Sequence, residues 1–598
     1  MKEDILTRLS ALRKWMHAHG CQAYYIPSCD PHGSEYVADY WQCRAWISGF
    51  EGSAGTLVVT HTAAALWTDS RYFLEAEAVL EGTGIALMRE RVAGTPSVGE
   101  WLRAEGCTRL CADPRLYTTT HIADFAAEGI TLATCTPLSK EPLDNGVVTP
   151  FTTLWLDRPA LPQNPVVIHP LVYAGQSVSD KLACVRASYQ QCGSQAMAIT
   201  ALDEIAWLLN LRGSDVPCNP VFMAYVLVQD TEAHLYTDSP LTSGAMAQMQ
   251  AAGVQCHAYA DFVHAGKLIG GQCCMPTSAS VWVADCLAQG ATTLCTKPSP
   301  ITLLKAVKNE AEIAGLRAAQ LRDGVAMAYF LHDLAERVAA GGETEWSVAE
   351  RLAACRAAQP LYKGVSFETI AGYAANGAIV HYNATPQTAA QLLPRGFLLL
   401  DSGAQYEDGT TDITRTIPLG ALTDEECLAY TLVLKGHIAL TRARFPQGTC
   451  GTQLDLAARY ALWQAGMNYG HGTGHGIGAA LNVHEGPHQI RMNHVPTPLE
   501  PGMTTSNEPG HYAKGRFGVR IENVLVVVPY TTTDYGIFYQ FDDLTRCPID
   551  TTPLLLDHLT ADERTWLNSY HALVRQDLLP LIESEAVRTW LLAATEAI

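Results

Sequence analysis

The stretch FLLLDSGAQYEDGTTDITRTIPL, residues 397–419, decides the fold of the second half of the chain. Its apolar start predicts a buried strand, and EDG at 407–409 predicts a turn into a second strand. Alternation along that second strand places Asp412 and Thr414 on one face. Such a hairpin would bring Asp401 close to Asp412. Two unneutralised carboxylates that close would raise a pKa, whereas a metal ion would hold both ionised, so the stretch predicts a metal site.

Histidines follow apolar or glycine-rich runs in the same half of the chain. His471 and His475 stand four apart in HGTGHGIG, but the glycines between them argue against the helical HExxH pattern of zinc proteases. His484 lies in LNVHEGP, and His381 ends NGAIVHY. One histidine after an apolar run is usually a satisfied core residue. Four histidines in the segment that also holds the carboxylates indicate that these residues belong to one site.

Two glutamates complete the acidic set. Glu508, in SNEPG, precedes a tight turn that fixes its direction, and Glu522 shares a strand face with Arg520 in FGVRIENVLVVV. Alone, Glu522 and Arg520 would be an ordinary ion pair. An oxygen-rich set with a single imidazole favours Mn²⁺, Co²⁺ or Mg²⁺ over a thiolate-bound zinc site. Two ions roughly 3.5–4 Å apart can hold a bridging water and polarise a carbonyl, which is chemistry for hydrolysing an amide or ester.

The first half of the chain contains an internal repeat. CQAYYIPSCD at 21–30 matches SQAMAITALD at 194–203, and WTDS at 67–70 matches YTDS at 236–239. Each copy alternates short strands with helix-like segments, which predicts two separate α/β domains. The proline-rich segment DRPALPQNP at 157–165 separates them.

A second boundary lies at Pro298-Ser299-Pro300. Beyond it, apolar residues recur at helical spacing from about 303 to 339, and the glycines at 341–342 predict the end of that helical segment. The chain after Phe397 is expected to be rich in strands, with two closing helices between about 560 and 598.

The length, composition and net charge of the chain exclude several classes of protein. With 598 residues the chain is too long for a single core, and 48% hydrophobic with 17% charged residues is typical of a globular protein. A formal charge of −20 argues against nucleic-acid binding, and no apolar run approaches the ~18 residues that cross a bilayer. The start, MKEDILTRLSALRKWMHAHG, predicts an amphipathic helix and has no signal-peptide features. We therefore expect a cytoplasmic protein.

The 18 cysteines form no CxxC pair. Fourteen of them precede residue 300, away from the expected site; Cys107 and Cys111 form a lone CxxxC, and Cys273 adjoins Cys274. This distribution favours reduced, mostly buried thiols over a disulfide framework or a zinc ribbon.

Taken together, the acidic and histidine motifs resemble those of a known family. Asp401 and Asp412 with eleven-residue spacing, HGTGH, NVHEGP, EPG and GVRIEN resemble the pita-bread metallopeptidases (M24B), and within them the aminopeptidase P (Xaa-Pro aminopeptidase) family of the three-domain cytosolic type. Outside the site, DPHGSEYVADYW, SGFEGSAGT, WTDSRYF, ALDEIAWLLNLRGSD and LLKAVKNEAEI carry the same resemblance, which covers essentially the whole chain.

The resemblance implies a fold class and a domain plan. The fold would be α/β (α+β), with two related creatinase-N-like α/β domains at residues 1–160 and 161–300. A pita-bread catalytic domain would follow at 301–598, with a helical extension at its C-terminal end.

The resemblance also implies a role for each site residue. Asp401 would bind one ion, and His475 and Glu508 the other. Glu508 would also act as general base and acid, and the flanking histidines would orient the scissile carbonyl and the proline. The ligands shared by both ions would be Asp412 and Glu522. The complete expected set is Asp401, Asp412, His475, Glu508 and Glu522 at the metals, with His381, His471, His484 and Arg520 beside Glu508 as catalytic residues.

The implied activity is hydrolysis of the N-terminal Xaa-Pro bond of peptides with proline second. Two divalent ions per chain would be required, manganese first, with cobalt or zinc as alternatives, and the chain would form a homodimer. A metal-activated water suits this bond, because the proline nitrogen has no N–H for a conventional protease to bind and the proline ring clashes with most clefts.

Two other readings share parts of this pattern. A prolidase, which cleaves only Xaa-Pro dipeptides, uses the same chemistry but usually has one N-terminal domain rather than a repeated pair. The same fold also occurs in non-catalytic binding modules and in the metal-free hydrolase creatinase, which lack the ligand set found here.

Overall fold

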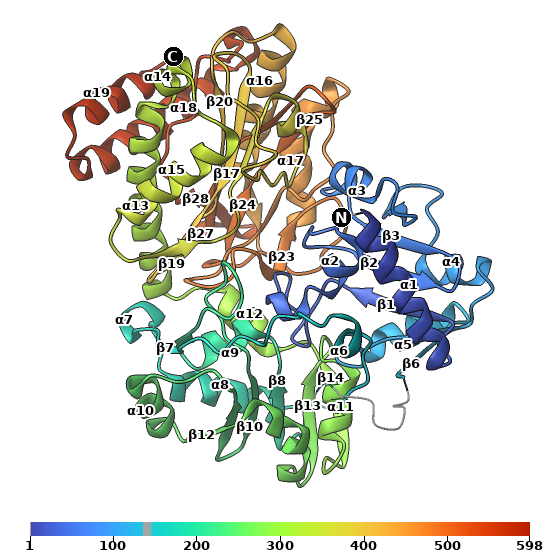
Figure 1. Ribbon diagram of the computed structural model, residues 1–598. Coiled ribbons are helices and arrows are strands. Elements are labelled where there is room, and N and C mark those ends of the chain that lie inside the picture. The colour runs from blue at the N-terminus through green and yellow to red at the C-terminus, as the bar shows by residue number, and fades with distance from the viewer. Residues whose placement is uncertain (1, 136–143, 145) are drawn as a thin grey trace. The chain divides into compact units, whose positions relative to one another are not determined.

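The computed structural model describes residues 2–135, 144 and 146–598. Its internal contacts divide the chain into two units, which are described separately. Unit 1 holds residues up to 169 together with 176–301, and unit 2 holds 170–175 and 302–598 (Figure 1). The three boundaries expected from the sequence remain a prediction.

Unit 1 contains two six-stranded sheets with the same strand order, one built from the first half of the unit and one from the second. The first sheet runs β4 (Ala86–Arg89), β3 (Ala64–Thr68), β2 (Thr56–Thr60), β1 (Ala23–Pro27), β5 (Arg109–Cys111), β6 (Thr131–Ala133). The second runs β12 (Val254–His257), β11 (Ala233–Tyr236), β10 (Tyr225–Gln229), β8 (Ala196–Ile199), β13 (Gln272–Pro276), β14 (Thr293–Lys297). The prediction of two related α/β domains is confirmed.

The chain begins with the expected amphipathic helix, α1 (Lys2–Ala18). Glu3 and Asp4 lie in its first turn, where carboxylates interact favourably with the helix dipole. Its buried face packs into the core of the first sheet through Ile5, Leu9, Leu12, Trp15 and Met16.

In unit 2 the helical pattern between 303 and 339 forms three helices rather than one. They are α12 (Pro300–Ala306), α13 (Glu310–His332) and α14 (Leu334–Ala340). The first break has a clear cause, because Asn309 caps α13 by accepting hydrogen bonds from the backbone N–H groups of Ala311 and Glu312. Gly341, at φ 82°, ends the segment as expected.

The stretch 397–419 forms four strands in two sheets, not one hairpin. β17 (Phe397–Ser402) pairs antiparallel with β20 (Ile413–Pro418), and Asp401 lies opposite Thr414. The short strands β18 (Ala404–Tyr406) and β19 (Gly409–Thr410) pair with each other around the expected turn and belong to another sheet. The juxtaposition of Asp401 with the start of β20 is therefore retained, although the intervening residues leave the sheet.

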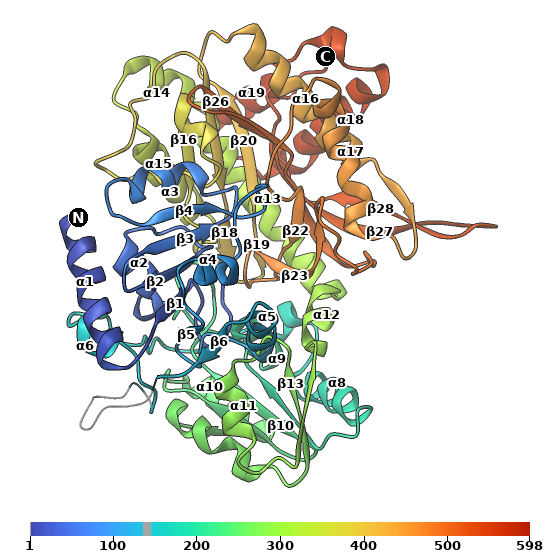
Figure 2. The same cartoon turned by 90° about the vertical axis from the view of Figure 1, so that its right-hand side faces the viewer.

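The remaining strands of unit 2 carry the other site segments. They are β22 (Gly474–Gly476), β23 (Glu485–Ile490), β24 (Thr504–Asn507), β25 (Gly510–Ala513), β26 (Phe517–Arg520), β27 (Asn523–Thr533) and β28 (Gly536–Asp543). The expected continuous strand from 517 to 528 is interrupted, because Ile521 and Glu522 lie between β26 and β27. The far ends of β27 and β28 project from unit 2 as a long hairpin (Figure 2).

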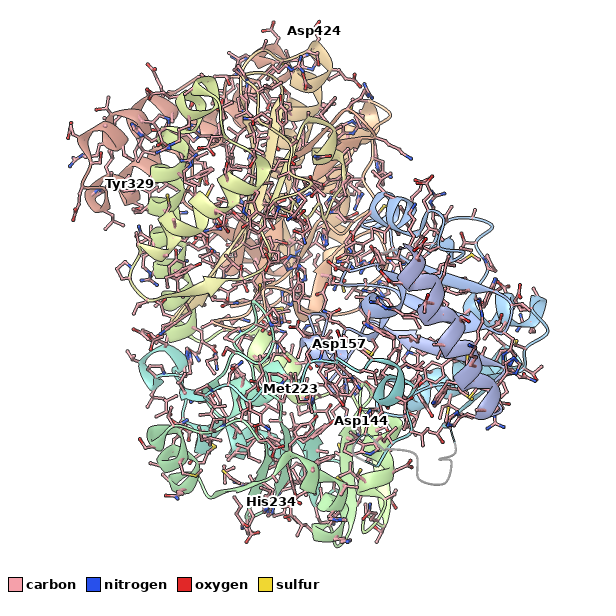
Figure 3. All side chains as sticks on the ribbon, in the orientation of Figure 1. Asp144, Asp157, Met223, His234, Tyr329 and Asp424 are labelled. Atoms are coloured by element: carbon pink, nitrogen blue, oxygen red, sulfur yellow. The ribbon has the colours of Figure 1, made fainter. Side chains whose placement is uncertain are left out.

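Two helices lie within the region that was expected to be rich in strands, α16 (Asp424–Thr441) and α17 (Gly451–Gln464). Asp424, labelled in Figure 3, begins the first of them. Most of α16 is buried, and its apolar run CLAYTLVLKGHIAL lacks the one-sided pattern that identifies a surface helix. The expected richness in strands is present in this region, and these two helices were not predicted.

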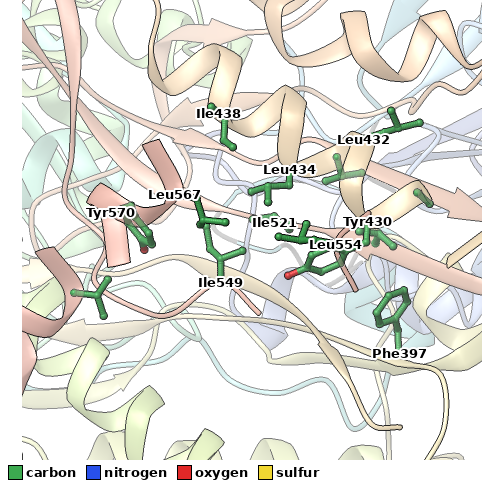
Figure 4. Close-up of a cluster of buried hydrophobic side chains, with 14 of the residues drawn as sticks. Phe397, Tyr430, Leu432, Leu434, Ile438, Ile521, Ile549, Leu554, Leu567 and Tyr570 are labelled. Atoms are coloured by element: carbon green, nitrogen blue, oxygen red, sulfur yellow. The ribbon is translucent and has the colours of Figure 1, made fainter. Parts of the chain in front are cut away.

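The expected closing helices are present as α18 (Ala561–Leu578) and α19 (Glu585–Ala594). They join α16 in a buried cluster of unit 2, which Figure 4 shows around Leu434, Ile521 and Leu567. Because this cluster includes Val519 and Ile521, which flank Arg520, it anchors the strand that leads into Glu522. No helix among the described residues is long and apolar enough to cross a membrane.

Candidate metal centre

Asp401 lies near the end of β17 with its two carboxylate oxygens in different surroundings. Oδ2 accepts a hydrogen bond of 2.7 Å from Nη2 of Arg520. Oδ1 is buried and has no hydrogen-bond partner among the described residues. A buried carboxylate oxygen without a donor is costly, and a cation would satisfy it.

Three further ligand atoms converge beside it. One atom each from Asp412, His475 and Glu522 lies within 4.8 Å of the other two. These side chains come from the start of β20, from β22, and from the two residues between β26 and β27. The fold of unit 2 therefore gathers, from several sheets, residues that are up to 110 positions apart in the chain.

The imidazole of His475 is oriented by its own backbone. Nδ1 lies 2.9 Å from the carbonyl of Gly476, to which it donates in the neutral ring, so Nε2 carries the lone pair. That Nε2 faces Oδ2 of Asp412 and Oε1 of Glu508, each at 3.6 Å. A lone pair directed at two carboxylates is repulsive unless a cation lies between them, so the arrangement fits a metal ligand.

Glu508 is held at the junction of β24 and β25. Its backbone N–H donates to the carbonyl of Thr473 at 2.8 Å, which ties it to the HGTGH loop. Its Oε1 accepts from the hydroxyl of Ser506 at 3.4 Å, and its Oε2 lies 3.8 Å from Nδ1 of His471. Glu508 therefore stands between two imidazoles, His471 and His475.

Glu522 is fixed by β20. Its Oε2 accepts a 2.8 Å hydrogen bond from the hydroxyl of Thr414, and its backbone N–H donates to the carbonyl of the same residue at 3.1 Å. The side chain is 2% exposed. Arg520, which would be the ordinary ion-pair partner of Glu522, forms its ion pair with Asp401.

The electrostatics of the protein alone indicate a missing positive charge. Burial, followed by the charges of Asp401 and Glu508, raises the pKa of Asp412 well above its usual range. Burial, followed by the charge of Asp412, does the same to the pKa of Glu522. Burial raises the pKa of Glu508 to about 7, although Arg520 opposes that shift. Three buried carboxylates and the partly buried Glu508, with one arginine, form an oxygen-rich donor set that suits hard divalent cations.

A residue that the sequence reading missed links the histidines to Asp401. The hydroxyl of Tyr512, on β25, lies 2.7 Å from Nε2 of His471 and accepts a 2.6 Å hydrogen bond from Nη1 of Arg520. Arg520 in turn donates to Asp401. Alternation could have identified Tyr512, because Gly510 opposes Arg520 in the β25–β26 hairpin and the residue two further on shares its face.

The other two expected histidines lie in loops of the same unit. The ring of His484 packs edge-on against that of His475, with 4.4 Å between centroids. His381 is half-buried and follows Val380, whose carbonyl accepts a 3.3 Å hydrogen bond from Nη2 of Arg520. Every residue expected in the site thus belongs to unit 2.

A buried ion cluster supports the segment after His484. Glu485, on β23, accepts a 2.7 Å hydrogen bond from Nζ of Lys305 and a second from Nζ of Lys308. All three side chains are less than 5% exposed. The motif LLKAVKNEAEI, noted for its resemblance alone, therefore has a defined structural role beside the site.

Family models match the chain along most of its length. The model of metallopeptidase family M24 matches residues 314–529, and that of the C-terminal region of this peptidase matches 537–598. Two models of the creatinase/prolidase N-terminal domain match residues 8–141 and 157–312.

Individual proteins match over nearly complete chains. The sequence is 41% identical to "Aminopeptidase P2" of Arabidopsis thaliana, covering 98% of this chain and 87% of that protein. It is 37% identical to "Xaa-Pro aminopeptidase 1" of Dictyostelium discoideum, covering 97% and 94%. The X-prolyl aminopeptidase of Caenorhabditis elegans, described as a cytosolic enzyme with a di-nuclear active site, matches with a TM-score of 0.91 at 32% identity over the whole of both chains. An Xaa-Pro dipeptidase of Bacillus anthracis shares the fold, with a TM-score of 0.52 at 22% identity over 62% of this chain and 99% of that one.

Proposed function

The chain belongs to the aminopeptidase P branch of metallopeptidase family M24, and on that premise we propose that it removes the N-terminal residue from peptides with proline second. We propose the cytoplasm as its compartment, because the nematode relative is described as cytosolic.

The single observation that carries the proposal is the unsatisfied acidic cluster. Oδ1 of Asp401 is buried without a donor, and ligand atoms of Asp412, His475 and Glu522 lie within 4.8 Å of one another. A fold that used these residues only for structure would leave this charge uncompensated.

We propose that two divalent ions, manganese first among the candidates, bind here. Asp401 would serve one ion, His475 and Glu508 the other, and Asp412 with Glu522 both. When bound, such ions lower the pKa of a water molecule and polarise the carbonyl of the scissile bond.

The chain's own residues would handle the proton. Glu508 faces the cluster between two imidazoles, so we assign to its carboxylate the proton that the attacking water gives up. The same proton would pass to the proline nitrogen as the C–N bond breaks, because a tertiary amide nitrogen is a poor leaving group until it is protonated. His381, His471 and His484 would orient the substrate and donate to the developing charge on the carbonyl oxygen.

The Tyr512–Arg520 pair would hold these residues in their relative positions. Arg520 is 1% exposed and donates to Asp401 and to the Tyr512 hydroxyl, which in turn reaches His471. One buried guanidinium therefore fixes a carboxylate at one end of the site and an imidazole at the other.

A comparison of two peptides tests this function against the prolidase alternative. We expect turnover of an Xaa-Pro-Pro tripeptide at its first bond, with release of a Pro-Pro dipeptide, because the duplicated N-terminal domain favours the longer-peptide enzyme. Chromatography of the products measures cleavage of the tripeptide. An Xaa-Pro dipeptide is assayed under the same conditions. Hydrolysis of the dipeptide alone would identify a prolidase, and a metal-free, inert protein would identify a binding module.

We further propose that the protein is a homodimer and that α17 contributes to its interface. Leu456, Tyr460 and Trp463 are 50%, 58% and 41% exposed, and their spacing of four and three places them on one face of the helix. A contiguous exposed apolar stripe on a helix of a charged protein is typical of a contact surface, and a second copy presents the same stripe.

Replacing Trp463 by glutamate tests the interface. A charge in the centre of a buried contact should raise the dimer dissociation constant by about thirtyfold or more, as at an interface hot spot. Sedimentation equilibrium measures it. The matched control is Trp346→Glu, because Trp346 is 37% exposed on α15 (Glu345–Ala357) and no other large apolar side chain of that described helix is exposed. An unchanged dimer, or equal weakening by the control, would contradict the assignment of the surface.

A further inference from the structure

Three thiols meet inside the first domain of unit 1, in a place that the proposed peptidase reaction does not use. The Sγ atoms of Cys21, Cys111 and Cys135 all lie within 4.8 Å of one another, and those of Cys21 and Cys135 are 3.3 Å apart. Their exposed fractions are 1%, 0% and 9%. Three polarisable sulfur atoms thus face one another in an apolar core.

The fold determines which three positions meet. Cys21 precedes β1, Cys111 ends β5, and Cys135 follows β6, so all lie at one corner of the first sheet. In that sheet Tyr24 pairs with Cys111, which aligns the three elements side by side.

The second domain provides an internal comparison, because its sheet has the same strand order. By strand register, the positions of Cys21, Cys111 and Cys135 correspond to Ser194, Cys274 and Lys297. There the hydroxyl of Ser194 lies 3.2 Å from Sγ of Cys274. The corner therefore brings the first two positions into contact in both copies, and the fold does not require sulfur at all three.

The spacing fits an ion held by three sulfur atoms. A metal–sulfur bond of about 2.3 Å places two ligands of one ion about 3.8 Å apart, within the range spanned by this cluster. Soft ligands such as thiolates select soft ions. We propose that Cys21, Cys111 and Cys135 form a binding site for a thiophilic ion that takes three sulfur ligands, of the trivalent arsenic class.

The net charge of the occupied site favours a trivalent ion. Three thiolates carry three negative charges, and a trivalent centre neutralises them completely, whereas monovalent copper would leave two charges in an apolar core. With arsenous acid as the ligand, three S–H and three As–O bonds break, three As–S bonds form, and three water molecules leave. No oxidation or reduction takes place.

Hydrogen bonds within the cluster separate the pKa values of the three thiols. Those from Cys135 and Cys21 lower the pKa of Cys111 to about 3. The hydrogen bonds to Cys111 raise the pKa of Cys21 to about 12 and that of Cys135 well above its usual range, so the ion-free cluster holds one thiolate and two thiols. Cys135 is the most exposed of the three, so an ion would reach the cluster from its side.

The test uses the full-length, metal-loaded protein in which the two exposed thiols, Cys184 and Cys256, are replaced by serine to remove adventitious sites. Under anaerobic reducing conditions we expect it to bind one equivalent of arsenite in equilibrium dialysis. Arsenic-edge X-ray absorption should then show three sulfur neighbours. Adding the substitution Cys21→Ser places at this position the residue type that the second domain has at Ser194. It should weaken arsenite binding at least tenfold, because removing even a residue that only hydrogen-bonds to a ligand lowers metal affinity by about that much.

The matched control is Cys107→Ser. Cys107 is buried in the same domain, but its thiol faces the carbonyl of Gln22 at 3.8 Å and is not part of the cluster. We expect this variant to bind arsenite like the parent, and circular dichroism verifies the fold of each variant. Equal weakening by both substitutions, fewer than three sulfur neighbours, or tight binding of Cu⁺ without binding of arsenite would overturn the proposal.

Discussion

Replacement of Glu508 by glutamine is expected to lower kcat by about a thousandfold or more. The substitution keeps the shape of the side chain but removes the group to which we assign the proton, and general acid–base catalysis contributes about 10²–10⁴ in rate. It also removes one anionic ligand from the proposed centre. Because Glu508 is anchored through its backbone to Thr473, the fold around it should be kept.

The measurement is steady-state kinetics on an Xaa-Pro-Pro peptide at saturating manganese. The control variant is Asp534→Asn, which removes one carboxylate from the exposed tip of the β27–β28 hairpin and should retain full activity. A Glu508→Gln protein with a tenth of the parent kcat would show that another group carries the proton.

Removal of divalent ions is expected to abolish turnover and to change how stability depends on pH. Without cations, burial raises the pKa of Glu508 from its ordinary 4.5 to about 7, and raises those of Asp412 and Glu522 further. The folded, ion-free chain therefore holds protons that the unfolded chain releases. The contribution of these groups to stability is greatest below about pH 4.5, and that of Glu508 is lost as pH rises from about 4.5 to about 7, by roughly 3 kcal/mol.

Bound ions reverse this trend, because they hold the same carboxylates ionised. At a hundredfold excess over Kd they should add about 2.7 kcal/mol to the free energy of unfolding. Thermal unfolding of dialysed and manganese-loaded protein between about pH 5 and pH 8 measures both effects. Full activity after exhaustive chelation, or identical pH profiles for the two samples, would contradict the proposed centre.

The sequence predicted most of the site because its chemistry lies in short motifs. Asp401 and Asp412 flank a turn, and Glu508 precedes a Pro-Gly, so local pattern alone placed each at a strand end. Local pattern could not reveal their partners. Alternation placed Arg520 and Glu522 on one strand face, but the strand breaks between them and the Arg520 guanidinium donates to Asp401.

The fold, like the site, could be predicted from the sequence only in part. The duplicated strand order in unit 1 was foreseeable from the repeated CQAYY and SQAMA segments, because a repeated pattern folds into a repeated unit. Helix α16 was not foreseeable, because a helix buried on nearly all sides has no polar face and its apolar run is also compatible with a strand. Hydrophobic periodicity identifies amphipathic helices and strands, but it does not distinguish a fully buried helix from a buried strand.

The buried cluster of Glu485 with Lys305 and Lys308 limits where the catalytic half can be cut. The family model for the peptidase begins at residue 314, downstream of both lysines. A fragment started there would leave the Glu485 carboxylate enclosed without either ammonium group, a loss of about 3–5 kcal/mol. A stable fragment of the catalytic half therefore has to extend upstream of the segment that the family model matches and to include α12.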